Sequence, residues 1–409
     1  MFKQKIAATF KIIVFLSTQI TVAQTSLGDD WDPDKLNTIT TAVPFLMIAP
    51  DTRSGGMGDV GVASIPDANS QHWNSAKYAF IEQERGLSIS YTPWLSKLVP
   101  DINLAYLSFY SKLGEKQAIA SSLRYFSLGN ITFTNEYAEV TGQFNPNEFA
   151  LDFSYSRLLS DNFSMGVALR YIYSNLTGGQ YVAGFQTKPG MSAAADVGLY
   201  FQSDDKRMKD KVANWAWGMN ISNIGSKISY SESGNQDFIP INFRTGTSFN
   251  LDLDKYNTIS VLFDINKLLV PTQPEYEIDT LTGLPIIGLD GNYIINRGMN
   301  PDVPIVQGMI QSFYDAPGGF KEELREYMLS LGVEYWYNKQ FAMRTGYFYE
   351  HRTKGNRQYF TLGAGLKYSV FAFDFAYLIP AKQDVRSPLE NTLRFTLTFD
   401  FDALANPTN

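Results

Sequence analysis

The sequence predicts an all-β protein, an antiparallel transmembrane β-barrel of about 14 strands with an N-terminal hatch in its lumen. From Gly86 to Phe401, apolar and aromatic residues alternate with polar ones, which places successive side chains on opposite faces of a strand. The chain contains 24 Tyr and 29 Phe, and no segment after the N-terminus approaches the roughly 20 apolar residues that a membrane helix needs. Many such strands in series are typical of a membrane wall.

The first residues predict a secretory signal, residues 1–23, cleaved before Gln24. They contain basic residues, then an apolar segment, then a small-residue exit: Lys3, Lys5 and Lys11; Ile12 to Ile20; Thr21, Val22 and Ala23. The segment carries three lysines and no acidic residue, so its removal makes the formal net charge of -7 more negative. An acidic exported protein is a poor candidate for nucleic acid, and no nucleic-acid partner is expected.

The mature N-terminal part, residues 24–85, is expected to form the lumen hatch. Its glycine-rich stretch from Pro50 to Phe80 suits a backbone that packs closely against surrounding structure at torsions only glycine takes readily. A phosphate-binding loop is the alternative, but no predicted strand leads into Gly55 and no Gly-Lys-Ser/Thr ending follows. The candidate hatch residues are Arg53, Gly55, Gly56, Gly58, Asp59, Asp67, Trp73 and Asn74.

The barrel is expected over residues 86–402, followed by a C-terminal tail at 403–409. In the last predicted strand, Leu393, Phe395 and Leu397 share one face, which suits lipid, while Arg394 and Thr396 share the other. The predicted strands are 87–93, 103–113, 117–127, 148–159, 163–175, 192–203, 213–223, 241–251, 256–266, 329–337, 340–350, 357–368, 370–378 and 391–401. Short links alternate with long ones along the chain, as expected for short periplasmic turns and longer outer loops.

The longest link, residues 267–328, is too large for a plain turn and predicts two short amphipathic helices on the outer side. Pro304 would start the first helix, and the glycines near 318 separate it from the second. These helices could fold over the barrel mouth as a lid and bury their own apolar faces, or they could bind a partner. The partner-binding candidates are Val306, Ile310, Phe313, Tyr314, Phe320, Leu324 and Tyr327.

The inward strand faces carry charges of both signs, which predicts a network that braces a hatch. Its members are Arg124, Asp152, Arg170, Asp196, Arg244, Asp264, Glu334, Arg344, Asp374 and Arg394. The chain has no cysteine, and its two histidines, His72 and His351, lie outside any metal-ligand spacing. We therefore expect no cofactor, no metal and no enzymatic activity.

The motifs of the hatch resemble those of a known family. Gly55-Gly56-Met57-Gly58, Asp67-Ala68 and Trp73-Asn74, ahead of about 14 strands, resemble the FadL superfamily of outer-membrane barrels. Within it, the run Met47 to Asp59 and the run Asp67 to Lys77 look like the PorV family, also called LptO, of type IX secretion in Bacteroidetes. Ser75 departs from the Asn-Pro-Ala-Lys pattern of the resemblance, and a serine can still make the turn by hydrogen bonding to the backbone.

The resemblance implies a location in the bacterial outer membrane, in contact with its lipid or lipopolysaccharide. It implies binding to the C-terminal signal domains of secreted cargo, and association with the translocon barrel called SprA or Sov and with the surface attachment complex. The alternative is a FadL-like channel for long-chain fatty acids or other hydrophobic compounds. The name LptO also carries a lipid A deacylase attribution, but a hydrolase needs an activated nucleophile near a base, and the sequence has no Gly-x-Ser-x-Gly motif.

Overall fold

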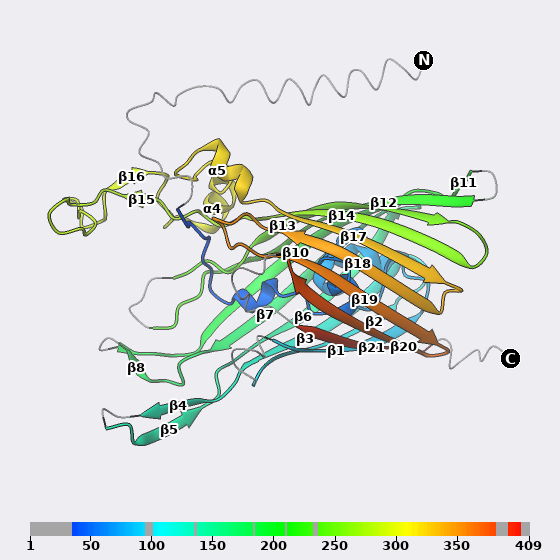
Figure 1. Cartoon of the computed structure of the whole chain (residues 1–409), viewed down its shortest axis with the longest axis horizontal. Coiled ribbons are helices and arrows are strands. Elements are labelled where there is room, and N and C mark those ends of the chain that lie inside the picture. The colour runs from blue at the N-terminus through cyan, green and yellow to red at the C-terminus, as the bar shows by residue number, and fades with distance from the viewer. Residues whose placement is uncertain are drawn as a thin grey trace, which may run out of the picture. The chain divides into compact units, whose positions relative to one another are not determined.

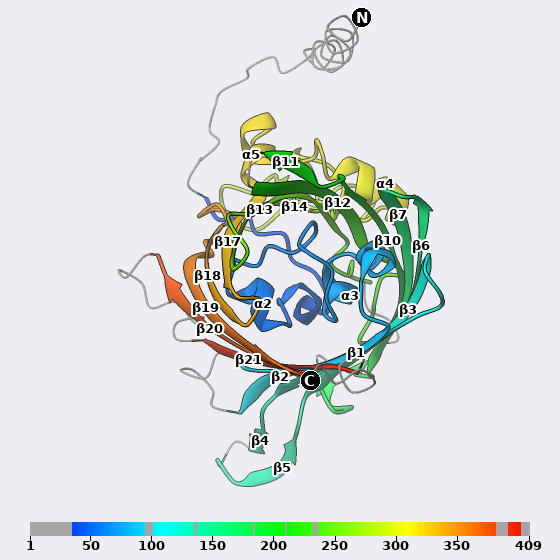
Figure 2. The same cartoon turned by 90° about the vertical axis from the view of Figure 1, so that its right-hand side faces the viewer.

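The wall of the molecule is a closed antiparallel barrel of 14 strands, which confirms the predicted fold class. Each wall strand pairs with its neighbours along the chain, and the first and last strands pair from Gly86↔Asp400 to Tyr91↔Phe395 to close the ring. Figure 2 looks along the barrel and shows the ring around the N-terminal segment. Among the described residues, no helix is long and apolar enough to cross a membrane.

This computed structural model describes residues 35–94, 101–134, 137–182, 185–208, 211–231, 236–381 and 392–401. The predicted signal, residues 1–23, and the predicted tail, residues 403–409, lie outside these ranges. The wall strands are β1 (Arg85–Pro93), β2 (Ile102–Lys112), β3 (Gln117–Leu128), β6 (Asn147–Ser160), β7 (Phe163–Asn175), β10 (Gly190–Gln202), β12 (Lys211–Gly225), β13 (Asn242–Asp252), β14 (Asn257–Leu268), β17 (Met328–Tyr337), β18 (Phe341–Tyr349), β19 (Gln358–Tyr368), β20 (Phe371–Pro380) and β21 (Leu393–Asp400). Each predicted strand agrees with the observed one to within two residues at either end.

Additional strands lie in the links between wall strands (Figure 1). Three small hairpins occur at the long-loop end: β4 (Ile131–Thr134) with β5 (Val140–Phe144), β8 (Tyr181–Val182) with β9 (Phe185–Gln186), and β15 (Glu275–Tyr276) with β16 (Ile295–Arg297). At the opposite end, β11 (Lys206–Met208) pairs with the start of β12. The long-loop end is the expected outer side of a bacterial barrel.

The hatch fills the lumen with short helices. They are η1 (Pro44–Met47), α2 (Thr52–Gly55), α3 (Ser70–Trp73) and η2 (Ser75–Phe80), and Figure 2 shows α2 and α3 inside the ring. The chain enters this hatch from the long-loop end, where Asn37 N donates to Thr353 O at 2.9 Å and Ala42 N donates to Phe238 O at 2.9 Å. It leaves at the other end, where β1 begins.

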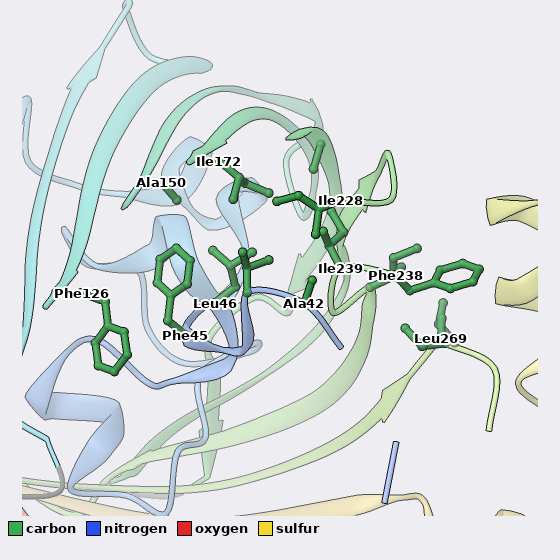
Figure 3. Close-up of a cluster of buried hydrophobic side chains, with 14 of the residues drawn as sticks. Ala42, Phe45, Leu46, Phe126, Ala150, Ile172, Ile228, Phe238, Ile239 and Leu269 are labelled. Carbon is green, nitrogen blue, oxygen red and sulfur yellow. The ribbon is translucent and has the colours of Figure 1, made fainter. Parts of the chain in front are cut away.

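A cluster of buried apolar side chains, here called the mouth cluster, lies where the start of the hatch meets the wall and the loops near the long-loop end (Figure 3). Phe45 and Leu46 of the hatch pack there among Phe126 and Ile172 of the wall and Ile239 of a loop. The rings of Phe45 and Phe126 stack with centroids 6.2 Å apart. Smaller apolar clusters also join the hatch to the wall, such as Met57 and Val60 with Leu262, and they lie among many buried polar and charged side chains.

The link between β14 and β17, here called the long loop (residues 269–327), contains the two predicted helices. They are α4 (Ile305–Gln311) and α5 (Phe320–Arg325). Pro304 stands just before α4 and Gly319 just before α5, where its φ of 63° suits glycine. Both helices lie at the long-loop end of the barrel (Figure 1).

Candidate functional site

Glycines of the wall and of the hatch meet in the lumen, and this close approach seats the hatch. A Cβ added at Gly332 would lie 2.7 Å from Met57 O, and one added at Gly363 would lie 3.2 Å from Gly56 Cα. A Cβ at Gly58, whose φ is 71°, would lie 2.7 Å from Tyr347 N. The backbones of hatch and wall are therefore in direct contact, with no room for side chains between them.

Two hatch side chains fix the fold of the hatch itself. Asp51 caps α2 by accepting from Ser54 N at 2.9 Å, and its second oxygen accepts from Trp73 Nε1 at 2.5 Å. Asn74 accepts from Ala76 N at 3.1 Å and donates to the wall at Leu199 O, 2.8 Å away. The turn after Asn74 is thus held by the asparagine, and the hydroxyl of Ser75 is buried without a hydrogen bond, contrary to the role expected for that serine.

Arg53 links the hatch to the wall through partly buried ion pairs. Its guanidinium binds both carboxylate oxygens of Glu334, at 2.9 and 2.8 Å, and also Asp67 Oδ2 at 2.9 Å. Glu334 also accepts from Arg344 Nε at 2.7 Å, and Arg344 NH1 donates to Asp374 at 2.6 Å. The bidentate pair fixes the orientation of Arg53 as well as its position.

Three more members of the predicted network contact hatch atoms. Arg394 NH1 donates to Asp59 Oδ1 at 2.6 Å. Asp264 accepts from the backbone N–H groups of Gly61 and Val62 at 2.8 and 3.0 Å. Arg124 NH1 donates to Leu46 O at 2.8 Å.

The remaining members differ in what they hold. Arg244 lies over the ring of Trp73, with its guanidinium carbon 4.4 Å from the centroid. Arg170 on β7 binds Asp152 on β6 and Asp196 on β10, with NH2 3.0 Å from Asp196 Oδ2. This second group braces the wall, because its bonds join side chains of β6, β7 and β10 and the backbone of Asn223 on β12.

Chemically, this interior is a set of ion pairs and hydrogen bonds around a seated hatch, in which single atoms of Arg124, Arg244, Asp264 and Arg394 are buried without a hydrogen-bond partner. Among the described residues, no group of three or more His, Asp or Glu is placed to hold a metal ion. His72 Nδ1 lies 2.6 Å from Arg124 NH2, and His351 Nδ1 lies 2.9 Å from Thr353 Oγ1.

The second candidate site is on the long loop, where six of the seven predicted partner-binding residues are exposed. We call them the exposed apolar set: Val306, Ile310, Phe313, Tyr314, Phe320 and Leu324. Phe320 is 75% and Val306 is 67% exposed, so the helices do not bury these side chains as a lid would. Tyr327 differs, because it is half-buried and its ring centroid lies 5.2 Å from Lys267 Nζ.

Helix α5 packs on the barrel through its acidic face. Lys354 Nζ lies 2.6 Å from Glu322 Oε1 and 2.9 Å from Glu326 Oε1. Lys267 Nζ pairs with Glu326 and lies 3.2 Å from Glu323 Oε2. Since its polar side is buried in ion pairs, the apolar side that carries Phe320 and Leu324 faces outward.

Helix α4 follows the same arrangement with apolar packing. Its Ile305 and Met309 pack against the mouth cluster, and a Cβ at Gly308 would lie 2.7 Å from the ring of Phe238. Val306 and Ile310 are on the remaining face and stay exposed.

Sequence reasoning missed a further apolar surface, the hairpin tip between β15 and β16. Leu281, Leu284, Ile287 and Leu289 are all more than half exposed there. The signal was present as an apolar stretch from Leu281 to Leu289 within a predicted outer loop. It carried no helical or strand period and was therefore not singled out.

The family model described as type IX secretion system protein PorV matches residues 32–275. This match spans more than half of the chain and includes the hatch and the wall strands β1 to β14. The chain belongs to the PorV family. It is therefore an outer-membrane protein of bacterial type IX secretion, and both the resemblance and the predicted localisation are confirmed.

Solved structures similar to this chain are barrels of low sequence identity. The Pseudomonas putida toluene transporter TodX has 10% identity and a TM-score of 0.47, covering 87% of this chain and 99% of its own. The Ralstonia pickettii toluene transporter TbuX has 10% identity and a TM-score of 0.42, covering 85% and 97%. A Pseudomonas aeruginosa FadL homologue has 12% identity and a TM-score of 0.41, covering 90% and 100%. No curated protein sequence matches the chain.

Proposed function

We propose that this PorV-family protein binds the C-terminal signal domains of secreted cargo and carries the cargo from the translocon barrel, SprA or Sov, to the surface attachment complex. The observation that carries the proposal is the polarity of α5, which buries Glu322, Glu323 and Glu326 and exposes Phe320 and Leu324. Burying charges while exposing aromatic and aliphatic side chains is unfavourable in water. Such a surface is expected on a protein that spends part of its cycle in contact with another one.

The energetics favour a protein partner of moderate affinity. Covering one large apolar side chain contributes about 1.5–3 kcal/mol, and only part of that sum appears as affinity after association costs. Six such side chains can therefore support binding that is specific yet reversible. Reversibility is what a carrier needs, since it must release cargo to the attachment complex.

The seated hatch supports a carrier that is not the conduit. Hatch and wall backbones touch at Gly332 and Gly363, and Arg53 ties the hatch to β17. A folded cargo domain has no route through this lumen unless the hatch leaves. The alternative, a fatty-acid channel, likewise requires hatch movement and a continuous apolar path, whereas buried charged side chains such as Arg53, Glu334 and Asp264 lie between the hatch and the wall. Contact with outer-membrane lipid or lipopolysaccharide is proposed for the outward wall faces.

The test is a pull-down from cell envelopes in mild detergent with a Val306→Ser, Ile310→Ser, Phe313→Ser variant. These side chains are exposed, so the barrel should fold and insert normally. We expect the wild type to recover a very large barrel and exported proteins with a shared C-terminal domain, and the variant to lose one or both. The matched control is Leu113→Ser, which removes an equally exposed leucine at the opposite end.

Two outcomes would redirect the proposal. Undiminished recovery and secretion by the triple variant would remove these helices from partner binding. Recovery of the wild-type barrel alone, together with saturable binding of a fatty acid to it, would favour the channel. We also propose that the protein is not an enzyme, since its sequence contains no Gly-x-Ser-x-Gly motif.

A further inference from the structure

A cleft of about 830 Å³ opens at the long-loop end. It is separate from the exposed apolar set, and none of those six residues lines it. Three distant parts of the chain form its walls: Thr40 before the first hatch helix, Lys227 and residues 236–238 between β12 and β13, and side chains between Val270 and Asp302 of the long loop. Its volume is within the range of sites that bind a small molecule or a short peptide segment.

The charged groups of the cleft are predominantly negative. The lining includes three carboxylates, Asp237, Asp290 and Asp302, and one ammonium, that of Lys227. Lys227 Nζ is already engaged, 2.9 Å from Asp302 Oδ1 and 4.5 Å from the ring centroid of Phe238. Asp302 keeps 90% of its side chain exposed, so that carboxylate still faces the cleft opening.

Asp290 is held ionised by its own turn. Its oxygens accept from the backbone N–H and the side-chain amide of Asn292, at 3.1 and 3.0 Å. These hydrogen bonds from Asn292 lower the pKa of Asp290. The turn therefore favours the ionised form of Asp290, one of the three carboxylates that face a single ammonium in the lining.

The uncharged lining is suited to a peptide backbone. Side-chain amides of Gln236, Gln273, Asn292 and Asn300 each offer a donor and an acceptor, and the rings of Tyr276 and Tyr293 add flat apolar surface. A hydrocarbon would leave the amides and carboxylates without partners, and a phosphorylated lipid would meet like charge. A cationic peptide segment satisfies the amides, the rings and the carboxylates together.

We infer that this cleft binds an extended, lysine- or arginine-bearing segment of the secreted cargo. The inference rests on the proposed function and assigns cargo recognition to a place separate from the apolar helices. Cargo and translocon would then bind different parts of the long-loop end, the cargo in the polar cleft and the membrane partner on the exposed apolar set.

The first experiment measures peptide binding by the purified full-length barrel in detergent micelles. The probes are two fluorescein-labelled peptides of equal length, one alternating lysine with serine and the other alternating glutamate with serine. We expect the lysine peptide alone to raise the fluorescence anisotropy saturably, and its binding to weaken as salt is added. Equal binding of the two peptides, or no binding of either, would overturn the inference, as would tighter binding of a neutral polysaccharide.

The variant Asp237→Asn, Asp290→Asn tests the location. Both residues are exposed, and asparagine preserves the turn geometry at Asp290. Loss of two exposed carboxylates should weaken the lysine peptide by about fivefold at low salt. The matched control, Asp254→Asn, changes an exposed aspartate with a similar turn, accepting from Tyr256 N at 2.8 Å, at the opposite end, and should bind as the wild type does. Identical affinities of the two variants for the lysine peptide would place its binding site elsewhere.

The same double variant in the envelope pull-down separates this inference from the proposed function. Loss of cargo with retention of the very large barrel supports the cleft as the cargo site. Full recovery of cargo by the double variant, with loss in the Val306, Ile310 and Phe313 variant, refutes the cleft and leaves the proposed function standing. Absence of cargo from the wild-type sample refutes both.

Discussion

Gly346→Ala should loosen the hatch without altering any charged contact. A Cβ added at Gly346 would lie 2.5 Å from Met57 O and closer still to Met57 C and Gly58 N, all backbone atoms of the hatch. Backbone cannot move aside as a flexible side chain can, so either the hatch or β18 must shift. Overpacking of this kind costs about 1–3 kcal/mol, and alanine recovers about 0.5–1 kcal/mol of strand propensity relative to glycine.

With an overpacking cost near the upper end of that range, the stability of the seated hatch should fall by about 2 kcal/mol in total. This corresponds to a roughly 30-fold larger population of states with a displaced hatch. Two measurements follow it: the urea midpoint of the barrel in lipid vesicles, and ion conductance in planar bilayers. We expect a lower midpoint and more frequent opening events than in the wild type, because a displaced hatch admits water and ions.

Gly142→Ala is the matched control for this substitution. The added Cβ there meets only Phe133 Cδ2, at 3.9 Å, in the β4–β5 hairpin. The propensity gain should therefore stand alone, and the variant should be neutral or slightly more stable. If Gly346→Ala and Gly142→Ala gave the same midpoint and the same low conductance, close hatch-to-wall packing would not be what closes the lumen.

Three further outcomes are expected. Arg53→Ala leaves Glu334 and Asp67 without their shared partner and should destabilise the hatch by about 3 kcal/mol. The same conductance and urea assays measure this loss. Arg207→Ala, at an exposed position, is the control and should change neither the conductance nor the urea midpoint. Burial, reinforced by Glu323 and Glu326, raises the pKa of Asp315 from 3.8 to about 7, so ionisation costs stability that grows as pH rises between these values. Asp315→Asn should remove this loss of stability, by about 2 kcal/mol at pH 8 after solvent screening, so residues 305–325 should exchange hydrogen more slowly than in the wild type at pH 8 but not at pH 4. The control is Asp279→Asn, at an exposed turn whose hydrogen bonds lower the pKa of Asp279, and it should show no such gain. Equal exchange in both variants would contradict the role assigned to Asp315. His72→Gln with His351→Gln should leave the acylation of lipid A unchanged by mass spectrometry, and a change that follows the histidines would instead indicate a His-dependent hydrolase.

The wall was predictable because its signal is local. The period of two in each strand needs only neighbouring residues, and the turn lengths fix the phase between strands. Inward charges could be named for the same reason. Their partners could not, because Arg53 reaches Glu334 across 281 positions of sequence, and only the register of the closed barrel decides which carboxylate it meets.

The orientation of α5 shows why burial is harder to predict than secondary structure. Its sequence has one apolar and one acidic face, and the usual expectation is that the apolar face packs inward. Lys267 and Lys354, from the end of β14 and from the loop after β18, reverse this by offering buried cations to Glu322, Glu323 and Glu326. The sequence of the helix alone does not indicate that those distant lysines will contact it.

The ion pairs of α5 also connect this helix to the start of the hatch. Asn37 Nδ2 donates to Glu322 Oε1 at 3.0 Å, the atom that Lys354 also binds. Asn37 is held at two further points, since its backbone N donates to Thr353 O at 2.9 Å and its Nδ2 also donates to Gln273 O at 3.2 Å. Beyond it, Phe45 and Leu46 are anchored in the mouth cluster and Arg53 is anchored on Glu334. Because these anchors are independent of α5, we expect a shift of α5 to leave the hatch seated, and the proposed exchange of cargo at the surface would then not require an open lumen.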